Sequence, residues 1–137
     1  MRHSNRDARD YQIIEKFEAG IELLGGDVKS LRVSMPQFAG SKVEIKNGVP
    51  YLLGVKIPKY KYSQGQIDTT RERRLLLKQK EIAKLISWRN QKYMLIPLGI
   101  YLSGKWFKVE IGVGRKMRKY EKREKIRAKE LRLNPQN

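Results

Sequence analysis

The sequence predicts a mainly β protein with inserted α-helices: a five- or six-stranded antiparallel OB-like β-barrel with about three helices and a flexible basic C-terminal tail. Three observations favour this fold class. Several short segments alternate polar and apolar residues, as half-buried strands do. The tight-turn signals Asn47-Gly48 and Ser103-Gly104 join neighbouring segments as hairpins. A small closed barrel then hides the strand edges that a set of hairpins would leave exposed.

The first third of the chain predicts strand, turn and short helix. Residues 11–17 have the composition of a strand, which is followed by the apolar-rich residues 18–24. Gly25-Gly26 then interrupts the pattern, as a turn does. Asp27 follows in a position where its carboxylate can cap a short helix through residues 28–32.

A hairpin and a long loop are predicted next. Residues 42–46 alternate polar and apolar side chains, and Asn47-Gly48 is the strongest short hairpin signal in the sequence. The return strand covers residues 51–57, where Gly54 suggests a bulge or a bend. Residues 58–70, rich in Lys, Tyr, Ser and Gly, are expected to form an exposed extended loop.

One long amphipathic helix is predicted from about Thr70 to Trp88. At about 100° per residue, Leu75, Ile82 and Ile86 form one apolar stripe. Two further strands complete the set, at residues 94–102 and 106–113, with Pro97 at an edge or a bulge.

The chain has 137 residues, which suits one domain with extensions, and its formal net charge is +17. Residues 114–137 contribute ten Lys/Arg against three Glu, a net charge of +7, which leaves +10 on the rest. We therefore predict a loose N-terminus at residues 1–9, an RNA-binding barrel at 10–113 and a basic tail at 114–137. Both the barrel and the tail can neutralise the phosphates of a polyanion.

The composition also limits the classes of function. There is no cysteine, which excludes disulfides and thiolate chemistry. No apolar run approaches the roughly 18 residues that span a bilayer, and the N-terminus has no apolar signal-peptide core. We expect a cytoplasmic, monomeric protein that binds nucleic acid and not a membrane.

Candidates for catalysis are few. The one histidine, His3, lies in the segment that we expect to be loose, so we interpret it as an exposed side chain. Glu18 and Glu22 could form a metal or acid–base pair, but ion pairing on a lysine-rich surface is the simpler interpretation. We expect no enzymatic activity, no cofactor and no metal. The rival of another class is a metal-dependent nucleic-acid-processing enzyme that uses Glu15, Glu18 or Asp27.

Three ordered clusters carry a resemblance to a known family. They are Glu18-Ala-Gly-Ile21 with Gly25-Gly-Asp-Val-Lys-Ser-Leu-Arg32, then Asp68-Thr-Thr-Arg-Glu-Arg-Arg-Leu-Leu-Leu-Lys-Gln-Lys-Glu-Ile82, then Lys108-Val-Glu-Ile-Gly-Val-Gly-Arg-Lys-Met-Arg-Lys-Tyr-Glu-Lys-Arg123. The chain resembles the SmpB family from Asn5 to about Arg123. Each motif alone is weak, but their ordered conjunction is highly specific.

The resemblance implies a fold, a function and partners. SmpB proteins are the tmRNA-binding proteins of bacterial trans-translation, and their fold is a six-stranded barrel related to OB folds. The resemblance implies a non-catalytic protein that grips the tRNA-like domain of tmRNA and helps to deliver it to stalled ribosomes. The tail, loose when free, is expected to fold as a helix in the empty mRNA channel, at the decoding centre of the small subunit.

The sequence departs from the family pattern at several positions. Asp27 replaces the usual Glu before Val-Lys-Ser, and Thr69 replaces the usual Pro after the central Asp. Ile67 and Lys42 also differ from the usual residues, which are often His and Tyr. The tail beyond Arg123 has 14 residues and is shorter than usual, which indicates a divergent member.

The resemblance assigns tmRNA contacts to Glu18, Leu76 and Lys108. Each position has an alternative interpretation. Glu18 could form a surface ion pair, and Lys108 could pair across strands. For Leu76 the helical periodicity favours packing in the core.

Further basic and tail residues are expected to contact RNA. The predicted phosphate ligands of the body are Lys29, Arg32, Arg71, Arg73 and Arg74, for which a solvated charged face is the alternative. The residues expected to act on the ribosome are Arg115, Lys116, Arg118, Tyr120, Glu121, Lys122 and Arg123. In this segment Tyr120 could stack on a base.

A second interpretation stays open within RNA binding. A general OB-like RNA-binding or ribosomal protein could use the same basic tail structurally, by threading it into ribosomal RNA. The RNA that the protein binds would distinguish the two.

Overall fold

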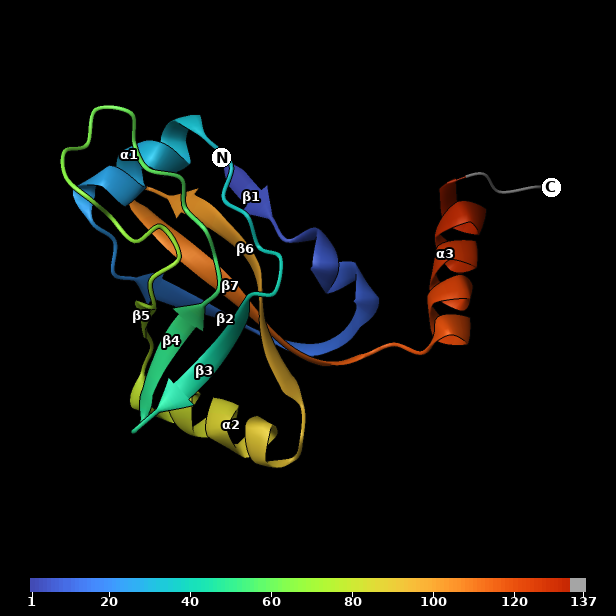
Figure 1. The fold of residues 1–137 in the computed structure, drawn as a ribbon. Helices are drawn as coiled ribbons and strands as arrows, with labels where there is room; N and C mark the ends of the chain where they lie inside the picture. Colours follow the sequence, from blue (N-terminus) through green and yellow to red (C-terminus); the bar gives the residue numbers. More distant parts are fainter. Residues whose placement is uncertain (134–137) are drawn as a thin grey trace.

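A computed structural model describes residues 1–133, and its main feature is an antiparallel sheet of seven strands (Figure 1). The strand order across the sheet is β1-β6-β7-β2-β5-β4-β3. In chain order the elements are β1 (Arg2–Ser4), the 3₁₀-helix η1 (Arg6–Asp10), β2 (Tyr11–Ile21), α1 (Gly25–Val33), β3 (Lys42–Lys46), β4 (Val49–Leu53), β5 (Arg73–Leu76), α2 (Gln79–Asn90), β6 (Met94–Ser103), β7 (Trp106–Lys116) and α3 (Lys119–Leu133).

The mainly β antiparallel class is confirmed, whereas a closed six-stranded barrel is not found. In residues 1–133 no ladder joins the two outer strands β1 and β3, so the sheet has two edges. The edge strand β3 carries the charged residues Lys42 and Glu44, whose side chains lie 3.0 Å apart. Charged side chains of this kind discourage pairing with another chain, so the open edge is protected without closure.

The seventh strand comes from residues 1–9, which we expected to be loose. β1 pairs with β6, and the amide of the buried Asn5 donates to the Pro97 carbonyl over 2.7 Å. The Asn5 side chain also accepts from the Asp7 N–H and so caps η1. His3 Nε2 lies 2.8 Å from the Leu31 carbonyl oxygen, so His3 is not simply an exposed side chain. These contacts hold the N-terminus on the sheet.

The helix expected at residues 70–88 is replaced by a strand and a shorter helix. β5 pairs with β2 and β4, and its Arg73 and Leu75 point inward. Helix α2 begins only at Gln79 and buries Ile82 and Leu85, whereas Ile86 is exposed. The Leu-rich run has a helical period, but two sheet partners satisfy the backbone of residues 73–76 and hold it extended.

Several local predictions are confirmed, and one helix start is wrong. Asn47 and Gly48 have φ of 52° and 77°, as a type I′ hairpin turn requires. A register shift after Pro97 marks the expected bulge. Gly54 has φ 77° and ends β4 in a bend. Helix α1, however, begins at Gly25, so Asp27 lies inside its first turn and not at the N-cap.

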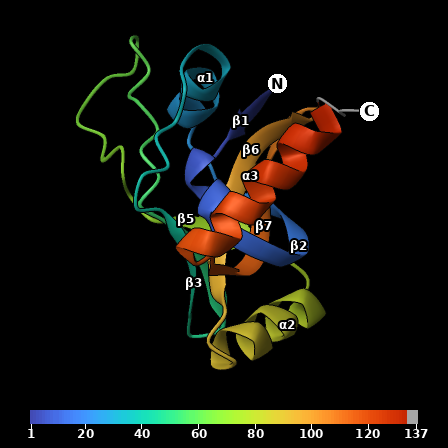
Figure 2. The same ribbon diagram turned by 90° about the vertical axis from the view of Figure 1, so that its right-hand side faces the viewer.

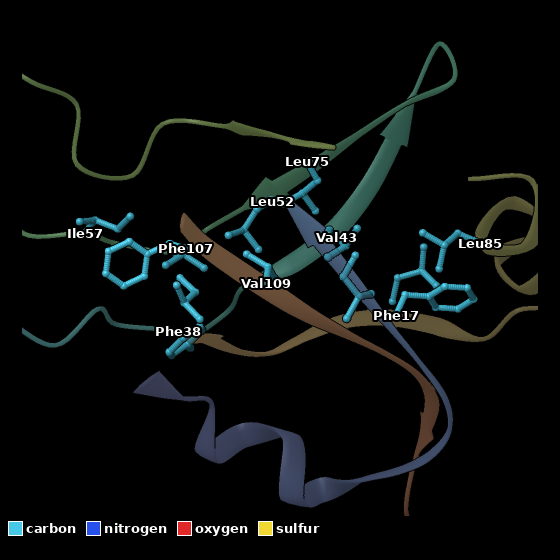
Figure 3. Packing of buried hydrophobic residues seen from close by; sticks show 14 of the residues in the cluster. Phe17, Phe38, Val43, Leu52, Ile57, Leu75, Leu85, Phe107 and Val109 are labelled. Atoms are coloured by element: carbon cyan, nitrogen blue, oxygen red, sulfur yellow. The ribbon is translucent and has the colours of Figure 1, made fainter. Parts of the chain in front are cut away.

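The core lies between the curved sheet and the elements that cover it. The long strands β2 and β7 supply Phe17, Phe107 and Val109, which meet Leu52 of β4 and Leu85 of α2 (Figure 3). Because alternate residues of these strands point inward, their other residues form an outer face of the sheet.

The tail begins later than Gly114, because β7 continues to Lys116 and pairs there with Tyr11. Helix α3 follows and buries no residue. Figure 1 shows it standing apart from the sheet, joined to it by the end of β7, and in the turned view of Figure 2 it lies in front of the sheet. The end of the predicted tail, residues 134–137, lies outside the described residues. None of the helices in residues 1–133 is long and apolar enough to cross a membrane.

Candidate nucleic-acid interface

Five strands place one residue each in a row across the outer face of the sheet. The paired residues are, from β1 to β5, Arg2, Tyr101, Lys108, Gly20 and Leu76. Directly paired residues of an antiparallel sheet point to the same face. The strand pairing therefore brings together Leu76 and Lys108, which are far apart in sequence, and we call this set the Gly20 row.

Gly20 lies between Lys108 and Leu76 in the row, and its missing side chain lets Leu76 pack closely against it. Its missing Cβ would lie 3.3 Å from Leu76 Cβ, tighter than most contacts of a real Cβ. A hollow opens beside it, and its lining includes Leu23 and Val28 near α1 and Trp106 and Lys108 of β7. The hollow is mainly apolar and is also lined by Lys105 and Lys108, a surface that can take the apolar face of a nucleotide beside its phosphate.

The two large apolar side chains at the hollow are exposed. Leu76 is 50% exposed and Trp106 is 73% exposed. Core packing, the alternative for Leu76, is therefore wrong, because Leu77 packs against the core instead. An exposed tryptophan and leucine on a basic face are poorly explained by stability and well explained by contact with a partner.

Glu18 lies two residues before Gly20 and on the same face of β2. The Tyr101 hydroxyl donates a hydrogen bond to Glu18 Oε2, and Lys108 Nζ lies 3.8 Å from Glu18 Oε1. Burial and the hydrogen bond to the Glu18 carboxylate raise the pKa of Tyr101 to about 12, so its hydroxyl stays a donor at neutral pH. The ion pair that was the alternative for Glu18 is therefore present. It leaves the Glu18 carboxylate about half exposed, so this carboxylate can still accept a hydrogen bond from RNA.

The basic residues of the body divide into exposed and buried groups. Arg74 is exposed and lies two residues before Leu76 on the same face of β5. Lys29 and Arg32 are exposed on α1. Arg71 is partly exposed and pairs with Asp27 in a fork of two hydrogen bonds. These four side chains can reach a phosphate, although Arg71 already holds a partner.

Arg73 does not fit the prediction of a phosphate ligand. Its side chain is 1% exposed, and its guanidinium donates to the carbonyls of Val55 and Thr69 over 2.9 and 3.0 Å. Arg73 Nη2 also lies 3.6 Å from Asp27 Oδ1. Because the inward positions of β5 alternate, Arg73 faces the core, where it cross-links α1, β5 and the loop before β5.

The buried carboxylate of Asp27 is the partner of both arginines. Burial alone raises the pKa of Asp27, but the Arg71 hydrogen bond, the Leu24 N–H and the charge of Arg73 together lower it below its ordinary value of 3.8. The Leu24 N–H donates to Asp27 Oδ2 over 3.0 Å. Asp27 is therefore ionised at neutral pH and fixes the start of α1.

The tail residues fall on the end of β7 and the first turns of α3. Glu121 accepts two hydrogen bonds from Arg115, at 2.7 and 3.1 Å, and Lys122 Nζ lies 3.2 Å from Asp10 Oδ1. The buried Met117 donates its N–H to the Asp10 carbonyl. Exposed side chains at the same place complete the expected set: Lys116, Arg118, Tyr120 and Arg123. The root of α3 is thus tied to the body.

The carboxylates of the enzymatic rival do not come together. Glu15 accepts from Trp88 Nε1 over 2.6 Å, whereas Glu18 bonds to Tyr101 and Asp27 lies between two arginines. Residues 1–133 contain no group of three His, Asp or Glu side chains that could hold a metal ion.

Three residues of the candidate interface were missed as contacts: Gly20, Tyr101 and Trp106. The alternation of β7 places Trp106 on the face of Lys108, a signal that the sequence contains. The roles of Gly20 and Tyr101 depend on which strands pair, and no local pattern shows that.

A basic antiparallel sheet with an exposed apolar hollow, flanking arginines and lysines, and a cationic helix defines a nucleic-acid-binding protein. The sequence profile of the family described as "SmpB protein" matches residues 2–137. The chain therefore belongs to the SmpB family, whose members are non-catalytic RNA-binding proteins.

Known proteins agree with this assignment. The SsrA-binding protein of Thermosipho melanesiensis is 46% identical over 125 residues, which cover 89% of this chain and 85% of that protein. The SsrA-binding protein of Microcystis aeruginosa is 41% identical over 130 residues, which cover 92% of this chain and 84% of that protein. A solved structure described as "tmRNA-SmpB: a journey to the center of the bacterial ribosome" matches with a TM-score of 0.72 and 38% identity, over 92% of this chain and 94% of that one.

Proposed function

We propose that this protein binds SsrA RNA (tmRNA) and acts with it on the ribosome in trans-translation. The observation that carries the proposal is the Gly20 row, because strand pairing brings Leu76 and Lys108 to one surface and places Glu18 beside them. Related proteins of this family are named for SsrA binding, and the similar solved structure concerns tmRNA, SmpB and the bacterial ribosome.

The chemistry of the face suits a folded, tRNA-like RNA. Lys108 lines the hollow, and Arg74 lies two residues before Leu76 on the same face, so both can meet phosphates. Lys29 and Arg32 extend the positive charge along α1. Leu76 and Trp106 offer apolar contact for an exposed base or ribose. The oriented Glu18 carboxylate can accept a hydrogen bond from a ribose 2′-hydroxyl or from a base amino group. Such a contact can recognise the sugar or the base, whereas phosphate contacts alone cannot.

The tail takes the second part of the proposed function. α3 carries seven Lys/Arg against three Glu and buries no side chain, so its surface is available to a polyanion. We propose that α3 enters the empty mRNA channel of the small subunit and that residues 115–123 lie near the decoding centre. Because the proposed function is carried out on ribosomes, we propose that the protein acts in the cytoplasm, as a monomer.

Sequencing the RNA that co-purifies with the protein tests this function. One dominant tRNA-like RNA with an mRNA-like portion is the expected result. A broad mixture of ribosomal RNA fragments would instead support the ribosomal-protein interpretation. A variant with Leu76→Ala and Lys108→Ala should lose most of the dominant RNA, whereas Ser87→Ala, on the exposed surface of α2, should retain it.

A further inference from the structure

The loop between β4 and β5 carries alternating lysines and tyrosines that the proposed face does not use. The segment reads Pro58-Lys-Tyr-Lys-Tyr-Ser-Gln-Gly65. Figure 1 shows this loop next to α1, at the end of the molecule away from α2. Its tyrosines are not core residues: Tyr62 is 70% exposed, and Tyr60 is partly exposed.

The aromatic rings and cations of the loop form one cluster. The Tyr60 and Tyr62 rings meet edge to face, with centroids 5.5 Å apart and planes at 67°. Lys29 Nζ from α1 lies 5.5 Å from the Tyr60 ring centroid, and Lys61 Nζ lies 5.1 Å from that of Tyr62. Each ring is therefore next to a lysine that can also reach a phosphate.

The loop is held in shape by its own hydrogen bonds. The Ser63 N–H donates to the Tyr60 carbonyl over 2.9 Å, and Lys59 Nζ donates to the Gly65 carbonyl over 2.5 Å. At its base, the Thr69 carbonyl accepts from the Ile57 N–H and from the buried Arg73. A loop ordered in this way loses less entropy when a ligand orders it further.

The chemistry of this cluster fits one kind of partner. Exposed aromatic rings interleaved with lysines are the pattern with which proteins bind unpaired nucleotides, because bases stack on the rings and phosphates meet the cations. Lys29, Lys59 and Lys61 supply three positive charges. The two acids of the loop already have partners, because Asp68 accepts hydrogen bonds from Thr70 and Glu72 pairs with Lys46.

We propose that Tyr62, supported by Tyr60, is a stacking platform for an unpaired base of the bound RNA. The inference rests on the proposed function, since the RNA is the one that the Gly20 row holds. Helix α1 connects the two sites: Val28 lines the hollow, and the next residue, Lys29, lies beside Tyr60. One RNA can therefore follow α1 from the hollow to the platform.

The test is a binding titration with an in vitro transcript of the tRNA-like domain of tmRNA. Tyr62→Leu should weaken binding by about 5- to 150-fold, the range measured for loss of one stacked base. Its salt dependence should stay unchanged, because no phosphate contact is lost. Tyr62→Phe should retain affinity to within about twofold, because it keeps the ring. Lys61→Ala should instead reduce the salt slope by about one.

A control on a distant surface is available in the same chain. Ser87 is exposed on α2, at the end of the molecule away from the loop (Figure 1). Ser87→Ala should leave RNA affinity unchanged. Equal affinities of Tyr62→Leu and wild type would overturn the platform, as would an equal loss in Tyr62→Phe. If the wild type itself fails to bind the transcript, the proposed function fails first, and the two failures are thereby distinguished.

Discussion

The adjacent residues Arg73 and Arg74 have opposite roles, and exchanging each for Met separates them. Arg73 is buried with Asp27 inside the protein, whereas Arg74 is exposed on the face of Leu76. Methionine keeps an unbranched chain but removes the guanidinium. Arg73→Met should therefore act on stability, and Arg74→Met on binding.

The magnitude for Arg73→Met follows from its contacts. The Val55 carbonyl loses its guanidinium donor, whereas the Thr69 carbonyl keeps the Ile57 N–H. Asp27 keeps Arg71 and the Leu24 N–H but loses a nearby charge. Breaking a buried pair costs about 3–5 kcal/mol. Among residues 1–133, Arg73 Nε has no hydrogen-bond partner, which lowers the contribution of the native pair, so we expect a loss of about 3 kcal/mol.

Urea unfolding followed by circular dichroism measures this loss, which corresponds to a drop in Tm of roughly 10 °C for a chain of this size. Arg74→Met should change the free energy of unfolding by no more than about 0.5 kcal/mol. In RNA titrations at several salt concentrations, Arg74→Met should reduce the salt slope by about one, and Arg73→Met should not change it while folded.

The reverse pattern would contradict these two roles. If Arg73→Met unfolds at the same urea concentration as wild type and reduces the salt slope, Arg73 is a surface phosphate ligand after all. The same experiment on Asp27→Asn, and on the Asp27→Asn/Arg73→Met double variant, adds a check. The sum of the stability losses of the two single variants should exceed the loss of the double variant. Each single change leaves one buried charged or polar partner behind, whereas the double change removes both.

Four further predictions concern acid stability, the hollow and the tail. The pKa of Asp27 is lower than 3.8 in the folded protein, so its ionised carboxylate stabilises the fold above pH 3.8. This contribution is lost as the pH falls through the folded pKa. Urea midpoints measured over this pH range should therefore fall less in Asp27→Asn than in wild type. Trp106→Ala should weaken RNA binding by about 5- to 150-fold if a base stacks there, with the free energy of unfolding within about 0.5 kcal/mol of wild type, and retained affinity would remove Trp106 from the interface. Glu121→Gln should weaken the fork to Arg115 and speed amide exchange in the first turn of α3, while exchange in β2 stays constant; unchanged exchange in α3 would show that the fork does not hold the tail. Deleting residues 119–137 should keep most of the affinity for the tRNA-like transcript but abolish tagging on stalled ribosomes, and loss of all affinity would place the RNA contact on the tail.

The local turns and most strands could be predicted because their signals are local. Asn47-Gly48 and the alternation around Lys108 each fix a structure within a few residues. The helix predicted at residues 70–88 was wrong in its first part because Leu75 falls on the same helical stripe as Ile82 and Ile86, although it lies in a strand. What decided it was the pairing of β5 with β2 and β4, which depends on distant residues.

The candidate site shows the same limit. The assignment of Glu18, Leu76 and Lys108 as RNA contacts came from the family resemblance. Helical periodicity alone placed Leu76 in the core, whereas its side chain is exposed. The burial of Arg73 could not be predicted either, because its partner Asp27 lies 46 positions earlier in a helix that meets β5 only in the folded protein. Charge indicated a polyanion, but only the sheet register shows which face can bind it.

The most direct test of the Gly20 row is site-specific crosslinking to the tRNA-like domain of tmRNA. A photoreactive amino acid is placed at Leu76 in one variant and at Ser87, exposed on α2, in another. We predict that irradiation crosslinks the RNA to the variant with the photoreactive residue at position 76 and not to the variant with it at position 87. Efficient crosslinking at Ser87 with none at Leu76 would show that the RNA lies on a different face.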